Sequence, residues 1–371
     1  MKLRIAKGQL RSALLSLSLP LFACGLYAQS GTGSKPLTGD AVTHGNPHLE
    51  TLTWTKPEKY DTGWKSAVAM LQTGLIVEVH QSESLSNSVI WYHIGKLDPE
   101  KGTVKWGESR SLIPSGDWPS VAVTEEGYVI VTYSDGFYNC CSKLRYIVGT
   151  VSPGGDQNQT ITFKTNSKGT EFDTGFHDSV SVNNLGVIVE AHQSGQGGDG
   201  IFTRVGHLTD PGAGNFTITW SGNGGDWYDK GVDPKISVND NNDVVEVHRI
   251  NGSEAKLHYA RGKVLFDRQV SFESDHPRLD SEGGGGSVVL LNNSSIIEVN
   301  HRSSKGIVYR TGTLSGQHAI SWSEPQEIDG TKDHYYPAIT ADATDTVLTF
   351  HSGEEGIFRS VYLRYSTAKL P

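Results

Sequence analysis

Short runs of alternating hydrophobic and polar residues follow one another along the chain, and four kinds of run recur in the same order about every 50 to 60 residues. Their length, their period of two and their β-branched and aromatic residues are typical of β-strands. The clearest kind, here called run b, reads Ile-Val-Glu-Val-His at residues 76–80 and recurs at residues 188–192, 244–248 and 296–300. Residues 129–133 and 347–351 fill the same slot in weaker form.

Three other kinds of run surround run b. Run a precedes it and follows a turn that reads Asp-x-Gly in three copies, as at residues 61–63. Run c comes after run b and is an aromatic or aliphatic strand ending in glycine, as at residues 91–95. Run d reads apolar-x-aromatic, as in Val-Lys-Trp at residues 104–106. Glycine, asparagine and aspartate between the runs indicate the turns of antiparallel strands.

The number of copies predicts the topology. Runs a, b and c occur six times, and the last run c, at residues 362–365, has no run d after it. The missing copy is at the other end, because Leu52-Thr53-Trp54 matches run d and precedes the first run a. We therefore predict an all-β, six-bladed β-propeller of four-stranded antiparallel blades, in which a strand at about residues 50–55 completes the last blade and closes the ring. A linear β-solenoid would not explain the displaced run d.

The repeat also resembles a known family. Its consensus, Asp-x-Gly, then Pro-Ser-Val-Ala, Val-Glu-Val-His-Gln-Ser, a Trp-Tyr strand ending in glycine and Ile-x-Trp, is similar to repeats of secreted bacterial β-propeller proteins, some of which carry them beside a phospholipase-like domain. The resemblance covers about residues 50–371, departs most in the second and fifth copies, and implies a propeller without implying a chemistry. A more distant similarity links the repeats to sialidase-type propellers, although the chain shows no Ser-x-Asp-x-Gly-x-x-Trp box and no assignable arginine triad.

The N-terminus has the three parts of a secretory signal peptide: basic residues up to Arg11, an apolar run from Ala13 to Ala23, and a small residue, Ala28, before the expected cleavage site. We expect a signal peptide at residues 1–28, a flexible linker at 29–47 and the propeller at 48–371. The protein would be secreted or periplasmic. Leu21-Phe22-Ala23-Cys24 also resembles a lipobox, which leaves a lipid anchor through Cys24 as the alternative. The apolar run is too short to span a membrane, so we expect no transmembrane segment.

Charge and cysteine content narrow the class further. The 371-residue chain has a formal net charge of −9, and removal of the four basic residues of the leader brings it near −13. This acidic balance argues against nucleic acid as a partner. Only Cys140 and Cys141 remain after cleavage. Adjacent cysteines form only a strained disulfide, so a vicinal disulfide and two free thiols both stay open, as does the oligomeric state.

Glutamate and histidine two positions apart in run b point to one face of a strand, as Glu78 and His80 do. The pair could be a metal ligand set, but its recurrence in several blades favours packing, and we predict no metal site. In blades one, three and four, an aspartate precedes the histidine of run b by nineteen residues. We therefore predict a structural staple in which the aspartate hydrogen-bonds the histidine: Asp61 with His80, Asp173 with His192 and Asp229 with His248. No cofactor is predicted. Asp233, Asp240 and Asp243 could hold Ca²⁺, but their spacing matches no calcium motif.

A ligand is expected on the loop face at one end of the central channel, because rigid β scaffolds usually place recognition on such loops. The predicted ligand-binding residues follow the turn before run a: Trp64, Lys65, Asp117, Trp118, Phe176, His177, Asp178, Asp233, Tyr335 and Tyr336. Aromatic faces beside carboxylates suit a sugar, so the first hypothesis is a secreted, lectin-like propeller that binds a polysaccharide or glycoconjugate. The alternative for the aromatic residues is that they only fill the channel.

A polysaccharide-active enzyme that uses the same face is the second hypothesis. For a lyase, Tyr138, Arg145 and His177 would supply a base, a carboxylate clamp and an acid. For a glycosidase, two carboxylates would be needed, with Asp117, Asp178 and Asp233 as candidates. An interaction or scaffold protein of the cell envelope is the third hypothesis.

Overall fold

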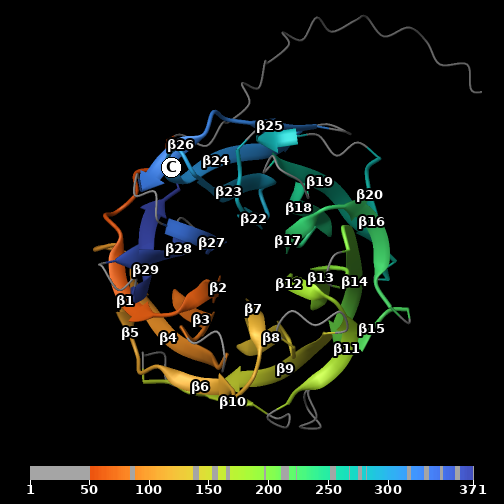
Figure 1. The fold of residues 1–371 in the computed structure, drawn as a ribbon, viewed down its shortest axis with the longest axis horizontal. Coiled ribbons are helices and arrows are strands. Elements are labelled where there is room, and N and C mark those ends of the chain that lie inside the picture. Colours follow the sequence, from red (N-terminus) through yellow and green to blue (C-terminus); the bar gives the residue numbers. More distant parts are fainter. Residues whose placement is uncertain are drawn as a thin grey trace, which may run out of the picture. The chain divides into compact units, whose positions relative to one another are not determined.

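The computed structural model describes residues 51–370, except for 84–87, 137–141, 153–157, 164–167, 196–197, 210–216, 223, 251–255, 267, 275–277, 281, 316–318, 330–333, 343–345 and 356–359. The signal peptide, Cys24, the linker, Tyr138, Cys140 and Cys141 therefore lie outside the described residues. The described residues form six antiparallel sheets arranged in a ring, so the predicted all-β, six-bladed β-propeller is confirmed (Figure 1). Among them, no helix has the length and apolarity needed to cross a membrane.

Each blade is built from three long strands and a short outer edge, and runs a, b and c form the long strands in order from the axis outward. The innermost strands are β2 (Trp64–Met70), β7 (Asp117–Val123), β12 (Phe176–Val182), β17 (Val232–Val238), β22 (Gly286–Leu290) and β27 (His334–Ala341). The second strands are β3 (Leu75–Gln81), β8 (Tyr128–Ser134), β13 (Val187–Gln193), β18 (Asp243–Ile250), β23 (Ser295–Arg302) and β28 (Thr346–Glu355). The third strands are β4 (Ile90–Asp98), β9 (Lys143–Val151), β14 (Gly200–Leu208), β19 (Lys256–Leu265), β24 (Gly306–Ser315) and β29 (Ser360–Lys369).

The outer edge of a blade consists of two short strands that pair with the same third strand. The first is run d, and the second contains the Asp-x-Gly aspartate or its equivalent. In blades one to five these pairs are β5 (Thr103–Trp106) with β6 (Arg110–Ile113), β10 (Ile161–Phe163) with β11 (Thr170–Thr174), β15 (Ile218–Trp220) with β16 (Asp226–Lys230), β20 (Gln269–Phe272) with β21 (Arg278–Asp280), and β25 (Ala319–Trp322) with β26 (Gln326–Asp329). The sequence pattern does not predict these second short strands, because their residues are typical of turns.

The N-terminal segment supplies both parts of the outer edge of blade six, which confirms the predicted ring closure. Trp54 forms a β-bridge with Ala368, and β1 (Glu58–Thr62) pairs with β29. Figure 1 shows the orange β1 beside the dark-blue β29. Leu52 is 4% exposed, and its backbone N–H donates to the Tyr309 hydroxyl of blade five at 2.9 Å. The ends of the chain are therefore joined by backbone pairing and by core packing.

The Leu52 contact repeats elsewhere in the ring, which identifies residues 52–54 as a true copy of run d. The backbone N–H of Val104 donates to the Tyr365 hydroxyl of the preceding blade at 3.0 Å, and that of Ile218 donates to the Tyr146 hydroxyl at 3.1 Å. Run d therefore bonds to the neighbouring blade at equivalent places in blades one, three and six.

The glycine that ends run c is explained by the aromatic residue of run d. Gly95 pairs with Trp106 across the two strands, and a Cβ atom at Gly95 would lie 2.8 Å from the indole ring. Gly206 has the same relation to Trp220. Any side chain at these positions would displace the ring, so the aromatic residue requires glycine opposite it.

The Asp-x-Gly segments lie between blades, which corrects the predicted staple. Asp61 belongs to the outermost strand of blade six and reaches His80 of blade one, with 3.7 Å between its Oδ2 and the histidine Nε2. The corresponding distance from Asp229 to His248 is 3.4 Å. Asp61 and Asp229 therefore connect adjacent blades rather than two strands of one blade, because each lies on the outermost strand of the preceding blade.

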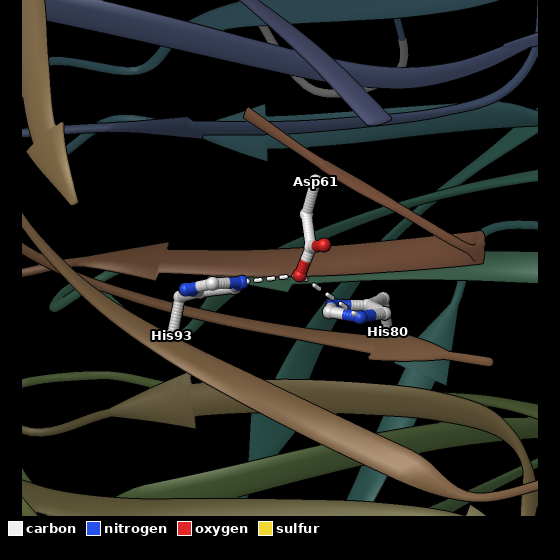
Figure 2. A group of neighbouring side chains, drawn as sticks. All are labelled: Asp61, His80 and His93. Atoms are coloured by element: carbon white, nitrogen blue, oxygen red, sulfur yellow. Dashed lines mark hydrogen bonds and ion pairs between the residues drawn. The ribbon is translucent and has the colours of Figure 1, made fainter. Parts of the chain in front are cut away.

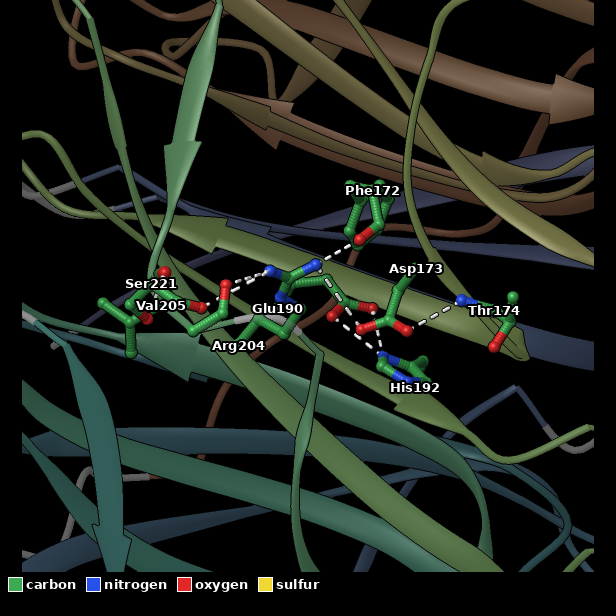
Figure 3. A network of polar contacts seen from close by, with 9 residues as sticks. Phe172, Asp173, Thr174, Glu190, His192, Arg204, Val205 and Ser221 are labelled. Atoms are coloured by element: carbon green, nitrogen blue, oxygen red, sulfur yellow. Dashed lines mark hydrogen bonds and ion pairs between the residues drawn. The ribbon is translucent and has the colours of Figure 1, made fainter. Parts of the chain in front are cut away.

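In blade three the aspartate has a different partner. Asp173 Oδ2 lies 3.5 Å from Nη1 of Arg204, and no hydrogen bond or ion pair joins Asp173 to His192 among the described residues (Figure 3). The predicted hydrogen bond between Asp173 and His192 is therefore wrong. The buried guanidinium of Arg204 on β14 attracts the carboxylate instead.

The glutamate of run b holds the histidine. Nδ1 of His192 lies 3.0 Å from Glu190 Oε2, and the equivalent Glu78–His80 distance is also 3.0 Å. Both glutamates are 0% exposed. Although burial disfavours a charged imidazole, the Glu190 carboxylate raises the pKa of His192. The prediction that each pair shares one face of its strand is confirmed.

Substitution of Asp173 by Asn is expected to lower the free energy of unfolding by about 1–3 kcal/mol, because Arg204 is buried and loses an anionic partner. Denaturant unfolding of the purified chain measures this. Glu171→Gln on the same strand is the control, because Glu171 forms an exposed ion pair with Lys143 and its loss should cost less than about 0.5 kcal/mol. Equal stability of Asp173→Asn and the unsubstituted chain would show that the blade interface does not depend on this carboxylate.

Candidate ligand-binding site

The innermost strands share a bulge at the same end of the ring. In blades one to four and six the pairing with the second strand shifts register there, as between Trp64 and Ala67. One residue within each bulge has a positive φ of 52° to 56°, and these residues are Lys65, Trp118, His177, Asp233 and Tyr336. Blade five has Gly285, with φ of 81°, at the corresponding place. A left-handed conformation costs a non-glycine residue about 1–3 kcal/mol, and such strain is concentrated at functional sites.

All six of these residues line one cavity of about 370 Å³. Residues from six different blades meet only around the axis, so this cavity lies at one mouth of the ring. Its remaining lining is Ser66, Pro119, Lys235, Arg249, Gly284, Gly286, His301, Tyr335 and Pro337. The volume is in the range of pockets that bind small molecules. Because the six central residues differ, the ring provides one asymmetric site there rather than six equal ones.

The aromatic residues of the cavity have different surroundings. The Lys65 ammonium lies 3.7 Å from the centre of the Trp118 ring, and the His177 ring lies 3.7 Å from it, centre to centre. Trp118 therefore packs against both Lys65 and His177. Tyr336 is 37% exposed and contacts Trp118 edge to face. Of the two, Tyr336 is the more exposed aromatic side chain.

Ion pairs fix the polar side chains. Lys65 Nζ lies 2.8 Å from Asp117 Oδ1, and Arg249 Nη2 lies 3.0 Å from Asp233 Oδ2. The other oxygen of Asp233 is bound to Nδ1 of His177. Burial alone would raise the pKa of Asp233, but His177 and Arg249 hold it below its usual range. Asp233 therefore stays ionised, and these groups are held in place before any ligand binds.

Lys235 is the cation of the cavity that lacks a direct partner. No hydrogen bond or ion pair to its ammonium occurs within the described part of the chain, although Asp178 and Asp233 influence it at longer range. Burial lowers its pKa from the ordinary value. A buried ammonium group without a direct partner would be stabilised by an anion that binds in the cavity.

The structure brings together six of the ten predicted ligand-binding residues, namely Lys65, Trp118, His177, Asp233, Tyr335 and Tyr336. The other four, Trp64, Asp117, Phe176 and Asp178, do not line the cavity. Asp117 supports it through Lys65, and Trp64 lies beside Tyr336 with 6.2 Å between ring centres. Phe176 is 6% exposed and packs into the protein.

Sequence reasoning missed Lys235, Arg249 and His301, although a signal was present. Lys235 occupies the place of Ala67 in blade one and Ser120 in blade two, so it departs from a repeat of small residues. Arg249 and His301 take the place of a glutamine that follows run b in blades one and three. A comparison of the copies position by position would have identified all three.

The predicted catalytic sets do not assemble in the described residues. Arg145 is paired with Asp135 at 2.6 Å and is not part of the lining to which His177 belongs, and Tyr138 lies outside the described residues. Of the three carboxylates proposed for a glycosidase, only Asp233 lines the cavity. The arrangement therefore offers a site with one carboxylate and several cations.

The three aspartates considered for calcium are also held separately. Asp233 lines the cavity, whereas Asp240 accepts hydrogen bonds from Asn184 and Asn292, and Asp243 pairs with Lys263.

Comparisons with known proteins identify the fold only. No family model matches the chain, and no curated protein matches its sequence. A protein of unknown function from Dyadobacter fermentans is 13% identical over 85% of this chain and 99% of its own, with a TM-score of 0.56. An α-L-arabinanase of Penicillium chrysogenum, solved with arabinobiose, is 10% identical over 84% of this chain and 98% of its own, with a TM-score of 0.52. An α-L-arabinofuranosidase of Fusarium graminearum, solved with an iminosugar inhibitor, is 11% identical over 85% and 98%, also with a TM-score of 0.52.

Asp178, directly after His177, gives the stability of the chain a dependence on pH. It is 0% exposed, and burial together with the nearby Glu190 carboxylate raises its pKa to about 7. A carboxyl group whose pKa is raised on folding stabilises the fold most below its unfolded pKa, and this contribution is lost as the pH rises through 7. Asp178→Asn should therefore lose less stability than the unsubstituted chain between pH 4 and pH 8, by about 2–4 kcal/mol in denaturant unfolding. If the free energy of unfolding changed with pH in the same way for the two proteins, ionisation of Asp178 would not destabilise the fold.

Proposed function

We propose that this chain is a secreted glycan-binding protein that holds one sugar residue in the cavity at the mouth of the ring. The carrying observation is the asymmetric cavity itself, which combines an exposed aromatic ring with polar side chains already fixed by ion pairs. A sugar needs both, because its C–H face packs on an aromatic ring while its hydroxyl groups require placed donors and acceptors. Proteins of similar fold include enzymes named for arabinose-containing glycans, but at about 10% identity they indicate the fold, so the proposal depends on the cavity.

The charges of the cavity favour an acidic glycan. Its lining contains Lys65, Lys235 and Arg249, but Asp233 is its only carboxylate among the described residues. Asp117 and Asp233 neutralise the first and the last of these cations. Lys235 remains for the ligand, and a uronate carboxylate or a sugar sulfate would supply its missing partner.

A lyase acting on an acidic polysaccharide is the second candidate function, and the His177–Asp233 pair favours it. Asp233 orients His177 beside the cations, so the imidazole could take the proton from the carbon next to a uronate carboxylate. The bond from the adjacent carbon to the glycosidic oxygen would break as a carbon–carbon double bond forms, and the departing oxygen would take up a proton from water and leave as a hydroxyl group. A glycosidase has less support, because it needs two carboxylates at the reacting bond.

Incubation of the purified chain with neutral and acidic polysaccharides separates these functions. Retention on acidic polymers without new chain ends is the expected result. New unsaturated ends would establish the lyase and overturn the proposal of a pure binding protein. Retention of neutral polymers alone would contradict the role given to Lys235.

Two substitutions test the site. Tyr336→Ala should weaken retention on the acidic polymer at least about 10-fold, because it removes the exposed stacking surface, and Lys235→Met should do the same by removing the cation. Affinity electrophoresis or calorimetry measures the change. Trp227→Ala is the control, because Trp227 is 57% exposed on β16 but does not line the cavity. A similar loss with Trp227→Ala would place the binding surface on the outer strands.

A further inference from the structure

Asp61, His80 and His93 form a cluster at the joint where blade six meets blade one (Figure 2). They come from three strands, β1, β3 and β4, and the potential ligand atoms all lie within 4.8 Å of one another. His93 Nε2 is 2.6 Å from Asp61 Oδ2, and His80 Nε2 is 3.7 Å from the same oxygen. Two imidazole nitrogens therefore converge on one carboxylate oxygen.

The far side of each imidazole is already occupied by an acceptor. His80 Nδ1 lies 3.0 Å from Glu78 Oε2, and His93 Nδ1 lies 3.1 Å from the Gly107 carbonyl oxygen. Each Nδ1 therefore carries a hydrogen, so Nε2 is the atom that can bind a metal ion, and His93 would release the Nε2 hydrogen that it donates to Asp61 when the ion binds. Metal-binding histidines characteristically donate their second ring N–H to a carboxylate or a backbone carbonyl in this way.

Comparison with the other blades shows what is particular to blade one. His93 pairs across the sheet with Glu78, and the residues in the same relation to the buried glutamate are Arg204 in blade three and Arg310 in blade five. The Arg204 guanidinium places positive charge 3.5 Å from Asp173, the counterpart of Asp61. Blade one has the same two carboxylates but no arginine there. Histidine instead offers a nitrogen lone pair to a cation from solution.

We propose that Asp61, His80 and His93 bind a divalent transition metal ion such as Zn²⁺, which ties the strand that closes the ring to blade one. Two imidazoles and a carboxylate are a donor set for such ions, whereas Ca²⁺ and Mg²⁺ prefer oxygen ligands. The two histidine side chains are 2% and 6% exposed, but Asp61 is 25% exposed, so an ion can enter from its side and keep water as a further ligand. Ligand atoms of a tetrahedral zinc site are about 3.3 Å apart, so His93 and Asp61 would separate slightly on binding. The recurring Glu–His pairs alone predict no metal site, because His93 does not belong to them.

The test is a titration of the tag-free chain, stripped of metal with EDTA, with Zn²⁺ and with Co²⁺. We expect one ion per chain, a visible Co²⁺ absorption band from nitrogen ligation, and an unfolding temperature that rises with metal concentration. His93→Arg reproduces the arrangement of blade three, so it should fold but bind Zn²⁺ at least about 100-fold more weakly. His93→Gln gives a second variant with the same expectation if arginine disturbs folding.

His258→Arg is the matched control, because His258 lies on the third strand of blade four opposite His248. It should bind Zn²⁺ as the unsubstituted chain does. Failure of the unsubstituted chain to bind either ion would overturn the proposal, and His93 would then be a protonated histidine that replaces the arginine. Unchanged binding in both His93 variants would overturn it as well, because the ion would then be held elsewhere.

Discussion

A glutamate with no exposed surface lies in the second strand of four of the six blades, and much of the structure is arranged to accommodate it. Glu78, Glu190, Glu246 and Glu298 are each 0% exposed. A buried carboxylate is costly unless hydrogen bonds or cations compensate it. Histidine two residues later provides that partner in three blades, and asparagine and arginine provide it in blade five. The histidine in turn requires glycine in the preceding segment, since a Cβ atom at Gly63 would lie 2.7 Å from the His80 ring. The repeated residues of run b and of Asp-x-Gly are therefore parts of one blade-to-blade contact.

The same need to join blades shapes the wall around the axis. Serine hydroxyls of one innermost strand accept hydrogen bonds from backbone N–H groups of the next, as Ser120 does from Val180 and Ser179 from Ile236. Ser237 and Ser287 continue the pattern in later blades. These strands are thus held at fixed positions, and in five of the six blades a bulge at the start of the strand carries a strained residue into the cavity. A rigid wall allows that strain to be maintained, and the variable residues at the bulges then give the cavity its chemistry without changing the fold.

The architecture could be read from the sequence because it depends on repetition. Six copies of runs a, b and c, with run d displaced to residues 52–54, specify both the number of blades and the closure of the ring. The position of the Asp-x-Gly aspartates could not be predicted from the sequence. Their strand pairs with one blade while their side chains contact the next, and a local pattern of residues does not show this.

The lining of the cavity was predicted only in part, for a related reason. Positions after the turn glycine were visible as a ring. Lys235, Arg249 and His301 reach the same cavity from positions outside that ring, and they differ from the residues at those positions in other blades. The inter-blade cluster around His93 was missed because its three members come from separate strands of two blades.

The central claim is that the ligand binds at the bulged end of the ring, and hydrogen–deuterium exchange of the chain with and without an acidic polysaccharide tests it most directly. The account predicts slower exchange in the first residues of the innermost strands, around Lys65, Trp118, Lys235 and Tyr336. Protection confined to the outer strands, or to the opposite ends of the innermost strands near Asn184, would contradict it.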